Sequence, residues 1–486
     1  MTVYVDIAEG AFLNDVLDVV RVFFGQVETS AAPLSGESAA AGLSLRVLLT
    51  RTGADRGYHI SASGCITGEA FSAFKDAPDP LEQKRLKKRA LKTAVYQVMK
   101  QGTGRQPPWG SLTGIRPTRL IYAQMDRGMS LDESCRFVGE TFDVSEGKLN
   151  LLREIVSAQQ RLPAVKKGDV EMYIGIPFCV SRCAYCSFLS GELGDGRLTG
   201  PYVEALLKEL RSTLELIKSK ALRLSTVYVG GGTPTSLSAE QLRLILTPVA
   251  ENIAGREFTV EAGRPDTIDR EKLRVLRNLG VSRISVNPQT MHDETLKRIG
   301  RRHTKLETEQ AYALAREMGF DDINMDLIAG LPGEDAGLFG ETLAWVGAMK
   351  PDSLTVHSLA IKHASILHLY GAPLPDGEMT AKMVDDGRRA AHAMGLTAYY
   401  MYRQKYMAGN LENTAYARPG AECLYNVRMM EETGNILALG AGGISKRVDL
   451  GHGRIVRAPN VGNIEEYIAR VDEMCARKRR LWEDEG

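Results

Sequence analysis

The sequence has almost no net charge: 61 lysines and arginines stand against 60 aspartates and glutamates, a formal charge of +1 at pH 7. A chain so balanced has no overall field to attract nucleic acid or an anionic membrane, so we expect neither as a partner. It also lacks any apolar run near the roughly 20 residues that span a bilayer, and no basic and apolar leader follows Met1. We therefore expect a cytoplasmic monomer with no membrane span.

Cysteine is scarce, and the seven cysteines are an odd number that does not suit a framework of paired disulfides. Three of them, Cys179, Cys183 and Cys186, fall within eight residues. This grouping is typical of metal ligands in a reducing compartment. The others are scattered, and packing is the simplest role for each of them: Cys65, Cys135, Cys423 and Cys475.

The length of 486 residues exceeds the usual size of a single core, so more than one domain is expected. Residues 1–165 alternate β-rich runs with helical patterns, which predicts an N-terminal α+β domain. Residues 166–397 repeat a short apolar run and an amphipathic helix. Residues 398–486 are less regular and predict a C-terminal α+β extension, which we expect to cover the substrate.

Two features of the N-terminal region have more than one interpretation. The basic run 84–89 lies in a predicted helix over 81–100, where a solvated face is the favoured interpretation and contact with phosphate or carboxylate is the alternative. The Gly- and Pro-rich segment 107–117 predicts an ordered turn. Its Trp109 and Arg116 are either packing anchors or contacts to the next domain.

The repeating middle region predicts six successive βα units. Such a pattern is typical of a parallel sheet, either doubly wound or curved into a partial barrel. Functional residues of these sheets follow the strands at their C-terminal edge. The expected strands lie near 172–176, 226–230, 257–261, 282–286, 322–327 and 352–357.

The cysteine group has the spacing C-x3-C-x2-C and directly follows the first expected strand. Three thiolates in one loop can wrap one face of an iron–sulfur cubane, whereas a structural zinc normally takes four ligands. Three ligands leave one iron open for chemistry. The alternatives are ordinary buried cysteines or a zinc site that borrows a distant histidine.

Polar or glycine residues also follow the later strands. Gly231, Gly232 and Thr233 follow the second strand, where glycine lets a ligand approach the backbone closely. Glu261, Gln289 and Asp326 end the next strands, and Arg301 lies further along. Their side chains suit hydroxyl, ammonium and carboxylate groups of a ligand. Individually, each is equally explained as a satisfied core polar residue or a helix cap.

These motifs together resemble the radical SAM superfamily, named for S-adenosylmethionine, and within it the oxygen-independent coproporphyrinogen III dehydrogenase family. The resemblance rests on the cysteine loop and on segments 230–235, 280–289, 299–303 and 324–333. Segments 112–117, 399–413, 423–426 and 440–446 resemble its clostridial-type subfamily with an N-terminal extension.

That resemblance implies an α/β fold, a partial (β/α)6 radical SAM barrel, which holds a [4Fe-4S] cluster on Cys179, Cys183 and Cys186. It also implies S-adenosylmethionine as a second cofactor, with Tyr173 among the catalytic residues. The implied contacts to S-adenosylmethionine are Tyr173, Gly231, Gly232, Thr233, Glu261, Gln289, Arg301, Asp326 and Ala360.

The implied activity is the oxidative decarboxylation of coproporphyrinogen III propionates to vinyl groups, which gives protoporphyrinogen IX in anaerobic heme biosynthesis. An electron donor such as flavodoxin or ferredoxin is implied as well. Two alternatives stay open: a heme-binding trafficking protein (a heme chaperone), and a radical SAM methyltransferase or heme-degrading enzyme.

The sequence departs from well-studied members of this family at two positions. They carry a fourth cysteine two positions after the triplet, where this chain has Phe188, and a histidine where it has Gly175. In the tail, three basic residues are candidates for binding propionates, although each is equally explained as a surface charge: Arg403, Lys405 and Lys446.

Overall fold

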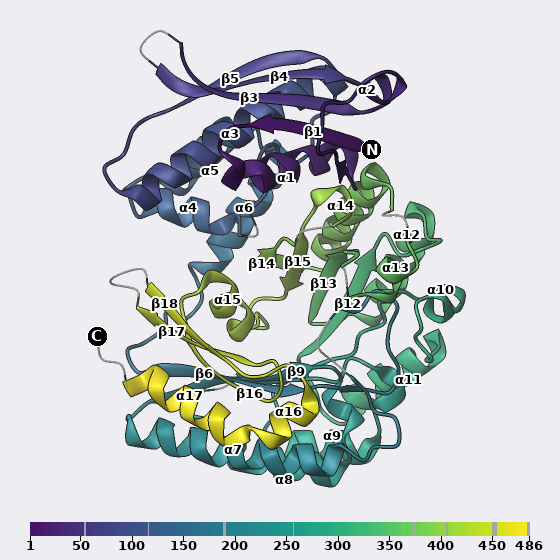
Figure 1. Ribbon diagram of the computed structural model, residues 1–486. Helices are drawn as coiled ribbons and strands as arrows, with labels where there is room; N and C mark the ends of the chain where they lie inside the picture. Colours follow the sequence, from purple (N-terminus) through teal and green to yellow (C-terminus); the bar gives the residue numbers. More distant parts are fainter. Residues whose placement is uncertain are drawn as a thin grey trace. The chain divides into compact units, whose positions relative to one another are not determined.

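The structure is a computed structural model. It describes residues 1–52, 55–114, 116–187, 191–255, 257–362, 364–372, 375–404, 407–449 and 454–483. The chain forms two compact units, of which the first comprises Met1–Arg153 with Arg403–Leu411, and the second Glu154–Tyr402 with Glu412–Gly486 (Figure 1). Among the helices of the described ranges, none is both long and apolar enough to cross a lipid bilayer.

The first unit is built on a mixed sheet in the order β2-β1-β3-β4-β5. β1 runs parallel to β2 and β3, whereas β3, β4 and β5 form an antiparallel meander. The strands are β1 (Thr2–Ile7), β2 (Glu28–Thr29), β3 (Leu43–Thr52), β4 (Asp55–Gly64) and β5 (Gly68–Phe74). Val3, Leu45 and Ile60 of this sheet are buried in one core with residues of two helices, described next.

The helices of the first unit follow amphipathic patterns in the sequence. α3 begins at a proline after Asp79, whose carboxylate accepts a hydrogen bond from the Glu82 amide, a favoured N-terminal cap. α1 and α3 supply Val20 and Leu91 to the core. The helices are α1 (Leu13–Phe24), α2 (Glu37–Ala41), α3 (Pro80–Thr103), α4 (Thr118–Met125) and α5 (Leu131–Phe142), and α6 (Glu146–Gln159) leads into the second unit.

The second unit contains the predicted βα series, and all six expected strands are confirmed. They lie side by side in chain order, each parallel to the next. This order is that of a (β/α)6 partial barrel. The strands are β6 (Asp169–Ile176), β9 (Arg223–Gly231), β10 (Glu257–Glu261), β11 (Arg283–Ser285), β12 (Ile323–Ala329) and β13 (Ser353–Ser358).

Helices connect these strands, and several begin with a capping box in which Ser or Thr and a Glu or Gln three residues later satisfy each other's amides. α7 and α8 lie along the outer side of β6 and β9 (Figure 1). The helices are α7 (Thr199–Ser219), α8 (Ala239–Ala250), α9 (Arg270–Asn278), α10 (Asp293–Arg298), α11 (Lys305–Glu317), α12 (Ala336–Met349), α13 (Ile366–Leu369) and α14 (Gly377–Ala393).

The rest of the chain extends both edges of this sheet. β15 (Asn413–Ala417) pairs antiparallel with β13 and with β14 (Thr397–Tyr402), and α15 (Leu424–Glu431) follows. At the other edge β16 (Asn435–Leu439) pairs in parallel with β6, followed outward by β17 (Ile444–Asp449) and β18 (Arg454–Pro459). α16 (Ile464–Ala469) and α17 (Val471–Glu483) lie against α7.

This topology differs from the predicted separate domain over 398–486. The segment shares hydrogen bonds with the barrel strands, so it belongs to the same compact unit, and residues 403–411 group with the first unit. The first unit also ends at Arg153, before the predicted boundary at 165. The sequence gives no signal for these pairings because their partners are distant along the chain.

Candidate functional site

The first cysteine of the loop is positioned by the strand before it. After β6 the chain enters the short strand β7 (Phe178–Cys179), which pairs in parallel with β8 (Gly191–Glu192). The Leu193 amide donates to the Cys179 carbonyl over 2.8 Å. The Phe178 ring is buried and meets the edge of the Tyr202 ring at 5.2 Å. Cys179 is therefore fixed at the C-terminal edge of the sheet.

The second and third cysteines lie against the turn that follows α10. The Ala184 amide donates to the Ile299 carbonyl over 2.9 Å, and the Cys186 amide donates to the Cys183 carbonyl over 3.0 Å. Gly300 has a φ of 76°, and a Cβ there would lie 3.0 Å from the Arg182 carbonyl oxygen. The loop therefore needs glycine at residue 300 to approach the barrel this closely.

Two hydrogen-bond donors reach the thiols. The Thr233 hydroxyl lies 3.5 Å from the Cys179 sulfur, and Nη1 of the buried Arg264 lies 3.7 Å from the Cys183 sulfur. Arg301 is also buried; burial alone would lower its pKa, but the neighbouring Tyr185 and Cys183 outweigh that effect and raise it. The loop is thus set among cations and donors that suit negatively charged sulfur.

The glycine loop after β9 is shaped by close contact with the chain after β6. The Gly232 amide donates to the Ile176 carbonyl over 2.7 Å, and the Thr233 amide donates to the Phe178 carbonyl over 2.8 Å. A Cβ at residue 232 would lie 2.7 Å from the Phe178 carbonyl oxygen. Gly231 has a φ of 110°, which a side chain would strain. Both glycines are required for this approach.

Glu261, at the end of β10, is a carboxyl group with a raised pKa. Burial and the negative charge of Asp326 raise the pKa of Glu261 to about 7, although the Tyr228 hydroxyl donates to its Oε1 over 2.6 Å. The ring of Tyr228 stacks on those of Tyr173 and Tyr425, with centroids 6.4 Å and 4.9 Å away. The Glu261 carboxyl group thus lies beside the stacked rings of Tyr173, Tyr228 and Tyr425.

Asp326 of β12 is held as a carboxylate. Its oxygens accept hydrogen bonds from Asn287 Nδ2 at 2.7 Å and Asn324 Nδ2 at 2.8 Å, and His357 Nε2 lies 3.7 Å away. Burial would raise the pKa of Asp326, but His357, Asn324 and Thr355 outweigh it and the pKa lies below its ordinary value. Glu261 and Asp326 are thus neighbours with opposite pKa shifts.

Gln289 and Arg301 present buried polar atoms without partners. Gln289 has a φ of 68°, which is uncommon for a residue other than glycine and is often found at functional positions. Arg301 Nη1 donates to the Asn287 carbonyl over 2.6 Å. Within the described part of the chain, Gln289 Oε1, Asn287 Oδ1 and Arg301 Nε are buried with no hydrogen-bond partner. Unsatisfied buried atoms are costly, so this cluster suits a polar ligand.

The predicted site residues therefore lie at the edge that was expected for them. Tyr173 and Asp326 lie within strands, Cys179, Gly231 and Glu261 each end one, and Arg301 follows α10. The others lie in the loops that follow strands, with Ala360 just beyond β13. Contacts or electrostatic interactions join neighbours across the sheet, from Thr233 to Cys179 and from Glu261 to Asp326. No group of three His, Cys, Asp or Glu in the described ranges converges tightly enough for a single metal ion. A cubane does not need such convergence, because each thiolate binds a different iron.

The comparisons with known proteins agree with this geometry. Residues 173–346 match the model of the Radical SAM superfamily. The "Oxygen-independent coproporphyrinogen-III oxidase-like protein HemZ" of Bacillus subtilis is 38% identical over 447 residues, which cover 87% of this chain and 88% of that protein. The "Heme chaperone HemW" of Escherichia coli is 30% identical over 60% of this chain and 74% of that protein.

The chain belongs to the coproporphyrinogen-III oxidase-like family of radical SAM proteins. Among solved structures, coproporphyrinogen III oxidase (HemN) from Escherichia coli aligns with a TM-score of 0.49 and 24% identity, and covers 68% of this chain and 74% of that one. The cofactors of this radical SAM chain are a [4Fe-4S] cluster and S-adenosylmethionine.

The residues present fit both radical SAM cofactors. Three cysteines on one loop, two of them near hydrogen-bond donors, are the donor set of a cubane with one open iron. The unpartnered atoms of Gln289, Asn287 and Arg301 fit a ligand that carries carboxylate, amino and hydroxyl groups.

The structure answers the questions left open for Trp109, Arg403 and Lys446 of this family member. Trp109 is buried, and the Arg403 guanidinium lies 5.0 Å over its ring, so Trp109 is a packing anchor within the first unit. Arg403 Nη1 donates to the Leu112 carbonyl over 2.6 Å and therefore binds backbone. Buried Lys446 donates to the Met429 carbonyl over 3.0 Å. Lys405 and Phe188 lie outside the described residues.

Cys423 is fully buried, and its thiol lies 3.5 Å from Glu257 Oε1, which agrees with a packing role. Sequence reasoning missed Arg264 and His357, although both touch predicted site residues. Arg264 follows Glu261 by three residues and His357 is the fifth residue of β13, so a wider search around each strand end would have included them.

Proposed function

We propose that the protein oxidatively decarboxylates two propionate side chains of coproporphyrinogen III and yields protoporphyrinogen IX. This reaction depends on the cofactor site, and the observation that supports that site is the set of unpartnered buried polar atoms at the sheet edge beside the cysteine loop. The extent of the similarity to the oxidase-like protein of Bacillus subtilis, along 87% of the chain, supports the substrate class.

In this proposal Cys179, Cys183 and Cys186 ligate the cluster. Arg264 donates to the Cys183 sulfur over 3.7 Å and balances negative charge on the loop. The Thr233 hydroxyl likewise donates a hydrogen bond to the Cys179 sulfur. Because both donors come from loops after neighbouring strands, the barrel itself fixes the electrostatic surroundings of the sulfurs.

The second cofactor would be held at the strand ends. Arg301 and Gln289 would bind its carboxylate, Gly231, Gly232 and Thr233 its amino group, and Glu261 and Asp326 would accept hydrogen bonds from its hydroxyls. Tyr173 and Ala360 border it. With the reduced cluster, this cofactor supplies one-electron chemistry strong enough to take a hydrogen atom from an unactivated carbon.

The chain's own residues keep that chemistry away from water. The rings of Tyr173, Tyr228 and Tyr425 stack on one another, and burial raises the pKa of each hydroxyl, so all three stay neutral. Glu261 accepts a hydrogen bond from the Tyr228 hydroxyl over 2.6 Å, and this bond orients its carboxyl group. Stacked neutral rings give their surroundings a low dielectric constant, which strengthens the electrostatic interactions within the site.

The proposed reaction balances at each propionate. The β-carbon loses a hydrogen atom, the bond to the carboxylate carbon breaks, carbon dioxide leaves, and one electron passes to a one-electron acceptor. A vinyl group remains. An electron donor of the flavodoxin or ferredoxin kind would reduce the cluster before each turnover.

The test is anaerobic incubation of the reconstituted protein with S-adenosylmethionine, a chemical reductant and coproporphyrinogen III, followed by mass analysis of the tetrapyrrole. We expect a product lighter by two formic acid equivalents. Unchanged substrate, with cluster and cofactor both bound, would refute the proposal.

The second candidate is a heme chaperone, favoured by the 30% identity to proteins of that name from Escherichia coli and from Bacillus subtilis. The same incubation distinguishes the two functions. A chaperone would bind heme tightly in an absorbance titration and leave coproporphyrinogen III unchanged. A methylated or ring-opened tetrapyrrole would instead indicate a radical SAM methyltransferase or heme-degrading enzyme.

A further inference from the structure

The first unit contains a pocket of about 190 Å³ that is separate from the barrel site. Two cationic side chains, Arg89 and Lys92 of α3, stand on one side of it. Residues 111–114 of the 107–117 segment, Leu120 of α4 and Phe142 at the end of α5 complete the lining.

The backbone around this pocket is held in place. Gly110 has a φ of 54°, and a Cβ there would lie 1.9 Å from the Phe142 carbonyl oxygen, so only glycine lets the two segments meet. The Ser111 amide donates to that same carbonyl over 2.8 Å. Arg403 Nη1 holds the Leu112 carbonyl from the other side over 2.6 Å. The pocket is therefore formed before any ligand arrives.

Arg89 is the unusual residue of this pocket. Lys84 and Arg85 of the same basic run are exposed, as a solvated face requires, but Arg89 is half-buried. Its guanidinium lies 5.5 Å over the Phe142 ring and makes no hydrogen bond or ion pair with any of the described residues. Burial lowers the pKa of Arg89 and the positive charge of Arg127 adds to that effect, whereas the negative charge of Glu82 opposes it in part. A half-buried cation without an ion-pair partner is costly.

Neighbouring charges leave the pocket positive. Lys92 Nζ lies 2.9 Å from both the Thr113 hydroxyl and an Asp15 oxygen, and Lys88 Nζ lies 2.9 Å from the other Asp15 oxygen. One carboxylate is thus shared by two lysines, and Glu82, the acidic residue whose charge acts on Arg89, pairs with Arg85.

We propose that this pocket binds a carboxylate carried on a small apolar body, such as an aryl- or alkyl-carboxylate. A guanidinium matches a carboxylate with two parallel hydrogen bonds. Leu112, Leu120 and Phe142 offer the hydrocarbon an apolar surface. The volume lies below the roughly 300–1,000 Å³ of sites that enclose drug-sized ligands, so the body is no larger than one ring.

The probe is 3-phenylpropionate, titrated by calorimetry into the anaerobically reconstituted full chain. We expect saturable binding of one equivalent. The uncharged analogue 3-phenylpropanol should bind at least tenfold more weakly, and so should inorganic phosphate, which cannot use the apolar walls. Absence of binding, or equal binding of either comparison compound, would overturn the proposal.

The variant Arg89→Gln should weaken the binding of 3-phenylpropionate at least tenfold, whereas Lys84→Gln on the exposed face of the same helix should leave it unchanged. Equal affinity of Arg89→Gln and the parent chain would refute the role of the guanidinium. If Arg89→Gln fails to fold, the comparison of 3-phenylpropionate with 3-phenylpropanol on the parent chain decides the question. Neither result depends on the function proposed for the barrel.

Discussion

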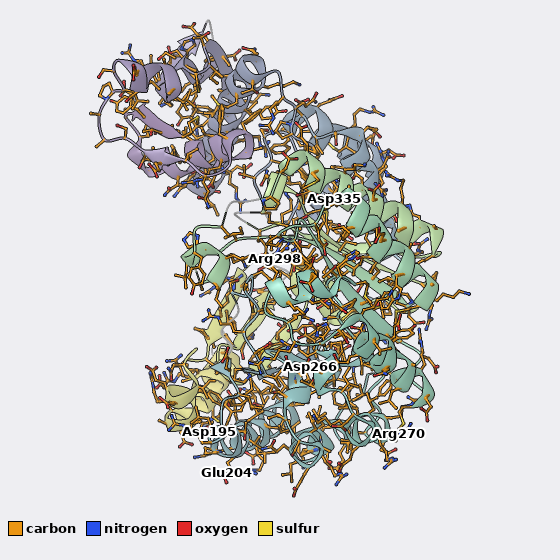
Figure 2. All side chains as sticks on the ribbon, turned by 90° about the vertical axis from the view of Figure 1, so that its right-hand side faces the viewer. Asp195, Glu204, Asp266, Arg270, Arg298 and Asp335 are labelled. Atoms are coloured by element: carbon orange, nitrogen blue, oxygen red, sulfur yellow. The ribbon has the colours of Figure 1, made fainter. Side chains whose placement is uncertain are left out.

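Arg264 Nη1 lies 3.7 Å from the Cys183 sulfur, while Nη2 of the same guanidinium lies 2.9 Å from Asp266 Oδ2. The carboxylate thus orients a buried cation toward one predicted cluster ligand. Asp266, labelled in Figure 2, lies in the short 3-10 helix Pro265–Thr267 between β10 and α9.

Replacing Arg264 should make the cluster harder to reduce. The guanidinium stabilises the extra negative charge of the reduced state, so Arg264→Gln should lower the reduction potential by on the order of 60 mV, a tenfold change in the one-electron equilibrium. An anaerobic redox titration followed by electron paramagnetic resonance measures the shift. Arg270→Gln is the control, because Arg270 pairs with Glu317 at the surface (Figure 2). An unchanged potential at full iron content would contradict the assignment.

Each of Cys179→Ala, Cys183→Ala and Cys186→Ala should abolish the broad iron–sulfur absorption of the anaerobically reconstituted protein, because a cubane held by two thiolates lacks an anchor. Cys423→Ala is the matched control, since that thiol is fully buried and contacts Glu257. Full absorption in all three loop variants would exclude these residues as ligands.

The raised pKa of Glu261 predicts a pH-dependent stability. In the unfolded chain this carboxyl loses its proton near pH 4.5, but the folded protein keeps it until about 7. Between these two pH values the folded state binds more protons than the unfolded state, so the free energy of unfolding falls as the pH rises. Above pH 7 the contribution of Glu261 to that free energy is lost. Relative to Glu261→Gln, the cofactor-free parent should lose about 3 kcal/mol from pH 4.5 to pH 8.

Urea unfolding of both proteins across this pH range gives the measurement. Parallel profiles of the parent and Glu261→Gln would show that the folded carboxyl titrates at its ordinary value. If the parent instead gains stability relative to the variant between pH 4.5 and pH 8, folding lowers the pKa of Glu261, which is the opposite of the expected shift.

Lys478 of α17 forms a buried ion pair with Glu209 of α7. Glu209 also accepts hydrogen bonds from the Gly440 amide and from Asn460 Nδ2, both over 2.8 Å. Lys478→Met leaves this buried carboxylate without its cation, so the free energy of unfolding should fall by about 3–5 kcal/mol.

Chemical denaturation measures this loss, with Lys208→Met as the control. Lys208 pairs with Asp472 at the surface, where such a pair contributes at most about 1 kcal/mol. Similar losses in the two variants would mean that the buried pair has no special role.

Much of the barrel could be predicted because it depends on local patterns. Apolar runs of strand length alternated with amphipathic helices, and the predicted site residues stood at the ends of those runs. A wider search around the strand ends would have included Arg264, but its role and that of the unpaired Arg89 depend on what surrounds them in space. Glu209 and Lys478 are far apart along the chain, and so are β16 and β6. No local sequence pattern could predict that they pair.

The position of β16 beside β6 has a consequence for how the protein is made. The strand that leads into the cysteine loop is synthesised long before the strand that covers its edge. Until residues 435–439 emerge from the ribosome, the outer amides and carbonyls of β6 have no neighbour and offer a template for pairing with another chain. Truncation before residue 435 would therefore yield a protein with an intact cysteine triplet that is prone to aggregate.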